Sequence, residues 1–270
     1  MRDGWRVRVP ASSANLGPAF DAVAVALTTH LEVFADGDET AGENHPAVRA
    51  FRNAGGRGPL SVRARFPGGR GLGYSAAARV GGLLAAHAQH GRGAREARAD
   101  TLRAATELEG HADNAAAALF GGVVAVAGRH VVRIPLAREL AVVAWVPRGE
   151  TPTASARRSL PDEVPFDDAV FNIGRTALLV AALSAGAVDA MRAASEDRLH
   201  QNRRLARARD TRVAIEAMLD AGAFAAWLSG SGPSAAAFCG RDDAVRIAAA
   251  LPNEGRALVL DIDDQGAVIT

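Results

Sequence analysis

Short apolar segments along the chain predict the strands of a sheet-containing fold. Residues 60–66 alternate Leu, Val, Ala and Phe with Ser and Arg, which is the period-two pattern of a strand. Residues 19–34 alternate apolar and small residues over a longer stretch and predict paired strands, and residues 123–127 and 131–134 predict a hairpin. Further strands are predicted at residues 6–9, 140–146, 224–228 and 256–262.

Longer stretches rich in Ala, Leu and Val predict helices between these strands. The helices are expected at residues 47–53, 75–90, 94–108, 172–183, 187–205, 210–221 and 242–251. Because strands and helices follow one another in two cycles, we expect a mixed α+β fold. We place a division near residue 148, which gives an N-terminal domain of residues 1–148 and a C-terminal domain of residues 149–270.

The composition is that of an ordinary globular protein. Hydrophobic residues are 49% and charged residues 23% of the 270, enough to bury a sizeable core. A formal net charge of +1 creates no strong field for nucleic acid or an anionic membrane, and 5% aromatic residues are few for base stacking. The sequence has neither an apolar run of about 18 residues nor an N-terminal signal segment. We therefore expect a cytoplasmic protein with no nucleic-acid or membrane partner.

Two residue types narrow the chemistry further. All 31 residues counted as Lys or Arg are arginines, which excludes a Schiff-base lysine and a P-loop lysine. The single cysteine, Cys239, excludes an internal disulfide and a Cys-rich zinc site. Any phosphate chemistry must therefore use backbone N–H groups, a helix N-terminus, Arg side chains and a metal ion.

A glycine-rich loop separates a predicted strand from a predicted helix. Within residues 67–78, the glycines at 69, 71 and 73 let the backbone approach an anion closely, and the following helix presents free N–H groups and its positive end. The segment lacks the Gly-Lys-Ser/Thr ending of a P-loop and does not fit a dinucleotide-binding pattern. A purely structural turn explains it equally well.

Three other segments offer polar groups in close spacing. Residues 107–114 hold three carboxylates, a His and an Asn, and a nucleotide-bound Mg²⁺ needs only one or two protein oxygens. The alternative there is a helix end followed by Asp113 or Asn114 capping the next helix. Residues 229–234 are small and glycine-rich, and residues 10–21 combine hydroxyl, amide and carboxylate groups. Each of these two is also explained by a structured turn.

Taken in order, these segments resemble the motifs of the GHMP kinase superfamily and, within it, those of homoserine kinases. The resemblance is spread over most of the chain, and residues 67–78 match the motif that binds ATP in the family. The matching segments are residues 10–21, 67–78, 109–114, 172–178, 197–201 with Arg204, and 229–234.

The resemblance implies a two-domain fold. Its N-terminal part is similar to the second domain of ribosomal protein S5, its C-terminal part is ferredoxin-like, and substrate and nucleotide lie between them. It also implies a homodimer that uses ATP and Mg²⁺ to phosphorylate the γ-hydroxyl of a small metabolite, L-homoserine, in threonine synthesis.

The family's roles pass to matching positions of this chain. The residues expected to wrap the ATP phosphates are Pro67, Gly69, Arg70, Gly71, Leu72, Gly73, Tyr74, Ser75, Ala76 and Ala77. The expected metal ligands are Ser75 and Glu109. The expected substrate-binding residues are Asn15, Asp21, His111, Arg204, Ser231 and Gly232. The catalytic step is assigned to Asn114, Glu109 and Arg204.

The chemistry of these side chains suits the assigned roles. Asp21 suits an ammonium group, and the Arg204 guanidinium suits a carboxylate in bidentate fashion. Asn114 cannot act as a general base. Phosphoryl transfer runs through a loose transition state, however, so positioning and charge neutralisation can carry most of the catalysis.

Four departures from the family pattern leave alternatives open. Tyr74 stands where a serine is usual, Ala19 stands where a glycine is usual, and Asn202-Arg203 replaces a usual Pro-Tyr pair. The chain is also somewhat short. The alternatives are a kinase of the same superfamily that phosphorylates another small hydroxy acid or amino acid, for which Arg203 would favour a more anionic substrate, and a non-catalytic paralogue that binds nucleotide or amino acid, which Tyr74 would favour.

Overall fold

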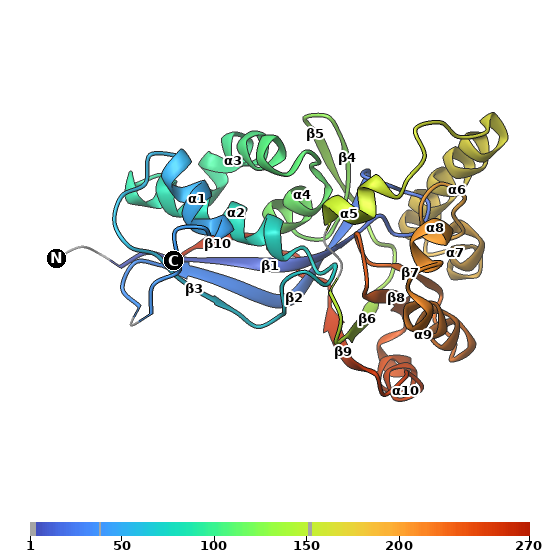
Figure 1. The fold of residues 1–270 in the computed structure, drawn as a ribbon. Coiled ribbons are helices and arrows are strands. Elements are labelled where there is room, and N and C mark those ends of the chain that lie inside the picture. Colours follow the sequence, from blue (N-terminus) through green and yellow to red (C-terminus); the bar gives the residue numbers. More distant parts are fainter. Residues whose placement is uncertain (1–3, 38, 151–152) are drawn as a thin grey trace.

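The strands of the protein form two antiparallel sheets (Figure 1). The structure is a computed structural model that describes residues 4–37, 39–150 and 153–270, and for residues 153–155 it describes the backbone alone. The first sheet has the order β10-β1-β2-β4-β5, and β3 also pairs with β2. Its strands are β1 (Arg6–Ala14), β2 (Val23–Phe34), β3 (Ser61–Ala64), β4 (Val123–Ala127), β5 (His130–Ile134) and β10 (Val268–Ile269).

The second sheet lies at the other end of the molecule and has the order β7-β8-β6-β9. Its strands are β6 (Ala141–Pro147), β7 (Ala225–Leu228), β8 (Ala235–Cys239) and β9 (Gly255–Asp261). Strands β7 and β8 are buried along their whole length, which fits their continuous runs of apolar residues. The predicted domain division near residue 148 falls directly after β6 and stays a prediction.

Helices cover one face of the first sheet, as Figure 1 shows. The helices of this layer are α1 (Pro46–Asn53), α2 (Tyr74–Gln89), α3 (Ala94–Glu109) and α4 (Asp113–Phe120). The central helix of this layer is α2, which packs on β1 and β2 and also contacts α1, α3 and α4. Its Ala-rich sequence lets these neighbours approach closely.

The remaining helices gather around the second sheet and the far end of the molecule. Helices α9 and α10 pack directly on this sheet, and α6 packs against α7. Their bounds are α5 (Thr153–Arg158), α6 (Phe166–Ala185), α7 (Val188–Ala194), α8 (Gln201–Leu205), α9 (Arg209–Asp220) and α10 (Ala244–Ala249), with a short 3₁₀ turn at Arg241–Asp243.

The structure corrects two of the predicted elements and adds a strand that was not predicted. Strand β1 continues to Ala14, through a stretch expected to be a loop, because it pairs with β2 over its whole length. The helix expected at residues 187–205 is two helices, since the Asp197 carboxylate accepts the N–H groups of His200 and Gln201 and starts a new helix there. Strand β8 was not predicted, because four of its five residues are Ala or Cys, types with weak strand preference.

Helix α6 exposes a long apolar face. Phe166 is 81% and Ile173 70% exposed, and the helix starts six residues before the predicted one. By length and composition alone, α6 is the one helix among the described residues able to cross a membrane, although Asp167, Asp168 and Arg175 interrupt its apolar residues. A single helix of this kind is weak evidence for a membrane span, so the expected absence of a membrane partner stays a prediction. The expected homodimer also stays a prediction.

Two helical glycines should respond in opposite ways to the same substitution. A Cβ atom at Gly82 on α2 would lie 2.0 Å from the Ala47 carbonyl oxygen, whereas one at Gly174 on α6 would meet nothing within 4 Å. We expect Gly82→Ala to lower the free energy of unfolding by about 1–3 kcal/mol through overpacking. Gly174→Ala should raise it by about 0.5–1 kcal/mol through helix propensity. Urea unfolding measures both, and equal effects would show that α1 and α2 are not in close contact.

Candidate active site

A cavity of about 170 Å³ lies where the end of β1, the start of α2, the segment before α4 and the loop between β7 and β8 meet. Most of the site residues expected from the sequence line it. These are Asn15, Asp21, Gly69, Gly71, Gly73, Tyr74, Ser75, Ala76, Glu109, His111, Asn114, Arg204 and Ser231.

The remaining expected residues lie away from this cavity. Leu72 and Ala77 are in the core, and the Arg70 guanidinium donates to the carbonyl oxygens of Arg148 and Gly149. Pro67 and Gly232 also do not line it. Their contacts with nucleotide or substrate therefore stay predictions.

The N-terminus of α2 opens into the cavity. Gly73 is the N-cap in the left-handed region, with φ +68°, and no side chain of the described residues caps the helix. The first N–H groups of a helix have no partner within it, and they carry the positive end of the helix dipole. This end of α2 is therefore a ready site for an anion such as a phosphate.

The glycine-rich loop and the loop after β7 are packed backbone to backbone. A Cβ atom on Gly71 would lie 2.2 Å from the Ser229 carbonyl oxygen, so only glycine fits this position. The Ser229 hydroxyl donates to the Gly71 carbonyl oxygen at 2.6 Å, and the Gly230 N–H donates to the Ala14 carbonyl oxygen at 3.0 Å. The glycine-rich segments at residues 67–78 and 229–234, which the sequence alone could also explain as structural turns, are thus parts of one site.

The end of β1 connects the other parts of the cavity. The hydroxyl of Ser12 donates to Asn114 Oδ1 at 2.8 Å, and a Cβ atom on Gly73 would lie 2.0 Å from that hydroxyl. The hydroxyls of Ser13 and Ser229 lie 2.7 Å apart. Asn114 therefore lies beside the start of α2. Neither it nor Asp113 caps α4, whose N-cap is Ala112, so the capping alternative is wrong.

Asp21 reaches the cavity from a tight turn before β2. Asn15 holds this turn, because its Oδ1 accepts the Asp21 N–H at 3.0 Å while its Nδ2 donates to the Gly230 carbonyl oxygen at 2.9 Å. Both residues have positive φ, at 77° and 55°. The two Asp21 oxygens accept from Arg157 Nη2 at 2.8 and 2.6 Å.

Two arginines flank the same wall of the cavity. The guanidinium carbons of Arg157 and Arg204 lie 5.2 and 5.1 Å from the ring centroid of Phe20. Arg204 is buried, and its Nε has no hydrogen-bond partner among the described residues. A buried donor without a partner is rare in proteins and costs stability, so the packing leaves this guanidinium incompletely satisfied. Sequence reasoning missed Arg157, Phe20, Asp113 and Gly230 as cavity residues.

Arg204 is fixed by buried polar groups beneath it. His200 Nε2 lies 2.7 Å from the Gly17 carbonyl oxygen, and its Nδ1 lies 3.4 Å from Arg204 Nη1. Burial lowers the pKa of His200, so the neutral ring can donate from Nε2 and accept at Nδ1. Asp197 accepts from Asn172 Nδ2 at 2.7 Å, and the same Nδ2 donates to the Pro18 carbonyl oxygen. The segments at 172–178 and 197–201 thus hold the turn of residues 10–21.

Ser75 and Glu109 converge on a single point. Arg79, one helical turn after Ser75, has its Nη1 2.7 Å from the Ser75 hydroxyl, and the same nitrogen contacts Glu109 Oε1. Hydroxyl and carboxylate oxygens are ligands that Mg²⁺ accepts. Because these two oxygens already surround one cationic group, the residues present fit the divalent ion that the resemblance implies.

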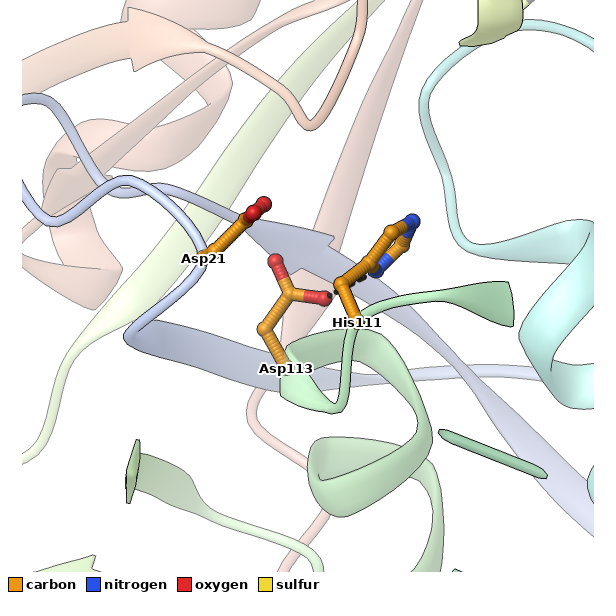
Figure 2. Close-up of side chains that lie close together, drawn as sticks. All are labelled: Asp21, His111 and Asp113. Carbon is orange, nitrogen blue, oxygen red and sulfur yellow. Dashed lines mark hydrogen bonds and ion pairs between the residues drawn. The ribbon is translucent and has the colours of Figure 1, made fainter. Parts of the chain in front are cut away.

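His111 and Asp113 form a charged pair beside Asp21 (Figure 2). His111 Nδ1 lies 2.8 Å from Asp113 Oδ1, and ligand atoms of all three side chains lie within 4.8 Å of one another. The hydrogen bond to Asp113 raises the pKa of His111 against the opposing effect of burial. This wall of the cavity therefore combines the carboxylates of Asp21 and Asp113 with a histidine whose protonated form is favoured.

Tyr74 turns toward a small aromatic cluster. Its hydroxyl lies 3.0 Å from His45 Nε2, and its ring meets Phe66 edge to face with the centroids 5.9 Å apart. His45 Nδ1 accepts the Ala47 N–H at 3.2 Å, and burial lowers the pKa of this histidine, so its Nε2 carries the proton that it donates to Tyr74. Tyr74 lines the cavity without closing it.

Comparisons with known proteins agree with this fold and this cavity. A family model described as GHMP kinases N terminal domain matches residues 43–122, and one described as GHMP kinases C terminal matches residues 179–257. The chain belongs to the GHMP kinase family, whose members are small-molecule kinases.

Within that family, the most similar proteins found are homoserine kinases. The chain is 42% identical to homoserine kinase from Thermus thermophilus, over 96% of each chain, and 39% identical to that from Streptomyces coelicolor, over 98% of this chain and 94% of the relative. A crystal structure of homoserine kinase from Cytophaga hutchinsonii matches with a TM-score of 0.87 and 26% identity, covering 100% of this chain and 98% of that one. The two-domain α+β fold expected from the sequence is therefore confirmed.

The pair of His111 and Asp113 makes a prediction for pH dependence. Because the folded pKa of His111 is raised above its ordinary value of 6.5, the stability from its charged form is fully present below about pH 6.5 and is lost as pH rises through the raised pKa. Asp113→Asn should bring the pKa down and remove this part of the pH dependence.

Proton NMR of the histidine rings measures the pKa directly, with the exposed His130 as an internal reference. Urea unfolding at several pH values gives the matching stability profile. An unchanged His111 pKa in Asp113→Asn would contradict the assigned pairing.

Proposed function

We propose that the protein transfers the γ-phosphoryl group of ATP to the side-chain hydroxyl of L-homoserine and releases O-phospho-L-homoserine and ADP. The observation that carries this proposal is a single cavity with two unlike ends. One end is the uncapped N-terminus of α2, which suits phosphates, and the other has Asp21 beside Arg157 and Arg204. The identity of 37–42% to homoserine kinases over most of the chain supports the same substrate.

A small amino acid fits the charges at the second end. The Asp21 carboxylate suits the ammonium group, and the guanidinium groups of Arg157 and Arg204 suit the α-carboxylate. Asp21 and Arg157 form an ion pair with each other, and a zwitterion would offer each of them a partner of opposite charge. His111 and Asn15 lie on the same wall and complete the substrate site.

The two departures that supported other functions have structural explanations. Arg203 is exposed and lies outside the cavity, so it gives no support for a more anionic substrate. Tyr74 is held by His45 and Phe66 at the edge of the cavity, so its ring leaves the start of α2 open. Neither the alternative kinase nor the non-catalytic paralogue is favoured by an observation in this protein.

The phosphates are proposed to lie on the N-terminal N–H groups of α2, with Gly69, Gly71 and Gly73 allowing close approach. Ser75 and Glu109 would hold Mg²⁺. The ion would supply charge neutralisation at the transferring phosphoryl group.

In the transfer, a bond forms between the substrate hydroxyl oxygen and the γ-phosphorus while the bond from the γ-phosphorus to the β–γ bridging oxygen breaks. Asn114 can orient the hydroxyl but cannot remove its proton, which would pass to a phosphoryl oxygen or to solvent as the new bond forms. His111 lies on the same wall of the cavity, and the hydrogen bond to Asp113 raises its pKa, which favours its protonated form. A loose transition state requires little help from a base, so we assign the rate acceleration to positioning and charge.

Several expectations extend beyond this site. The role in threonine synthesis, the cytoplasmic location, the homodimer and the absence of nucleic-acid and membrane partners all stay predictions. They rest on the family resemblance and on the composition of the chain.

Arg204 and its neighbour Arg203 provide a matched test of the acceptor. Arg204→Ala should raise the KM for homoserine strongly, leave the KM for ATP nearly unchanged and cost about 2–4 kcal/mol in kcat/KM, because a buried charge-assisted contact is lost. Arg203→Ala should have little effect.

The assay is ADP release with homoserine, with a panel of other hydroxy acids and with no acceptor. Homoserine kinetics that are indifferent to Arg204→Ala would overturn the substrate assignment. A preference for another acceptor would overturn the homoserine proposal.

Glu109 and Glu107 provide a matched test of the metal ligand. The Glu109 side chain is 9% exposed at the cavity, whereas Glu107 is 68% exposed and pairs with Arg103. Glu109→Gln should lower kcat by orders of magnitude, because charge on the transferring phosphoryl group would be poorly neutralised. Glu107→Gln should be nearly neutral. Equal losses in the two variants, measured by steady-state kinetics over a range of Mg²⁺ concentrations, would contradict the assignment.

A further inference from the structure

Arg79 occupies the point that the proposed metal ligands share. One of its nitrogens, Nη1, contacts both the Ser75 hydroxyl and Glu109 Oε1, as described above. The Glu109 side chain is only 9% exposed and that of Arg79 25%. A carboxylate so far removed from water needs a cation beside it, and Arg79 is the cation that contacts it.

A divalent ion and this guanidinium cannot use the two oxygens at once. Mg²⁺ binds its oxygen ligands at about 2.1 Å, and the Arg79 nitrogen is itself within hydrogen-bond distance of both oxygens. The ion and the guanidinium would therefore lie almost in contact, and both are positive. Metal binding at Ser75 and Glu109 must then be an exchange of one cation for another.

The displaced guanidinium would need a new anion. Burial, and then the positive charge of the nearby Arg49, lower the pKa of Arg79, so a guanidinium moved away from Glu109 would be disfavoured without a new anionic partner. Nucleotide phosphates at the N-terminus of α2 would bring negative charge within one helical turn of Arg79. The same nucleotide that delivers the metal would thus provide a partner for the arginine that the metal replaces.

We propose that Arg79 is a competing resident cation of the metal site, which holds Ser75 and Glu109 in place without ligand and is exchanged for the divalent ion when metal and nucleotide bind together. This inference rests on the proposed function. It implies that the free protein binds a divalent ion weakly and that nucleotide strengthens metal binding. By linkage, metal strengthens nucleotide binding by the same factor.

The test measures Mn²⁺ binding by electron paramagnetic resonance of the free ion, with no nucleotide and with ADP. Arg79→Met removes the charge and keeps the apolar stem. It should lower the Kd for Mn²⁺ of the nucleotide-free protein about tenfold, as loss of a charge-assisted competitor predicts, and should reduce the strengthening by ADP. Arg98→Met is the control, because Arg98 is also partly buried but stacks on Phe120 at 4.8 Å.

Further measurements test whether the metal binds at Glu109 and whether the variants are folded. The gain in Arg79→Met should vanish when Glu109→Gln is added. Arg79→Gln, which keeps a polar side chain, should show the same direction of change, and thermal unfolding in EDTA and in MnCl₂ should show a larger metal-induced rise in Tm for both Arg79 variants than for the wild type.

Unchanged or weaker Mn²⁺ binding in the Arg79 variants would overturn the proposal, as would a gain that survives Glu109→Gln. The homoserine-dependent release of ADP by the wild type reports on the proposed function separately. If that release is absent while the Mn²⁺ results hold, the function is rejected and the cation exchange stands.

Discussion

The structure depends on the contact that the end of β1 makes with loops from distant parts of the chain. The hydroxyls of Ser12 and Ser13 are fully buried, and they meet Asn114 and Ser229. Buried hydroxyls are costly unless each has a partner, so the segments can assemble only in a register that pairs them. The bond between Ser12 and Asn114 lies directly beside the start of α2 at the cavity. The residue at this position must be glycine, because a side chain on Gly73 would collide with Ser12.

Charge pairing is the second feature that organises the cavity. Asp21 pairs with Arg157, Glu109 with Arg79, and His111 with Asp113. Partly buried charges are stable only with a partner, so the charged groups of these three pairs already have one before any ligand is considered. Ligand binding would then replace internal partners with external ones, which keeps the free energy of binding moderate while the geometry is set in advance.

Local patterns in the sequence predicted many of the elements but not those governed by distant contacts. The hairpin of β4 and β5, the strand β3 and the helix after the glycine-rich loop were predicted within a few residues. Strand β8 was missed because its alanines have no strong preference and become a strand only between β6 and β7. Arg157 was missed as a cavity residue because it follows a polar stretch, and only the turn carrying Asp21, far along the chain, gives it a partner.

The sequence by itself determined the chemistry that is available. With no lysine, phosphate binding must use backbone, arginine and metal. The order of the motifs indicates the kinase family, and 42% identity to a homoserine kinase over 96% of the chain agrees with it. Only the tertiary structure decided which polar residues meet. It separates exposed Arg203 from buried Arg204, and it brings Arg79 between Ser75 and Glu109. The physical reason is that the spacing of residues on one helix or loop is local, whereas the pairing of buried charges depends on how whole elements pack.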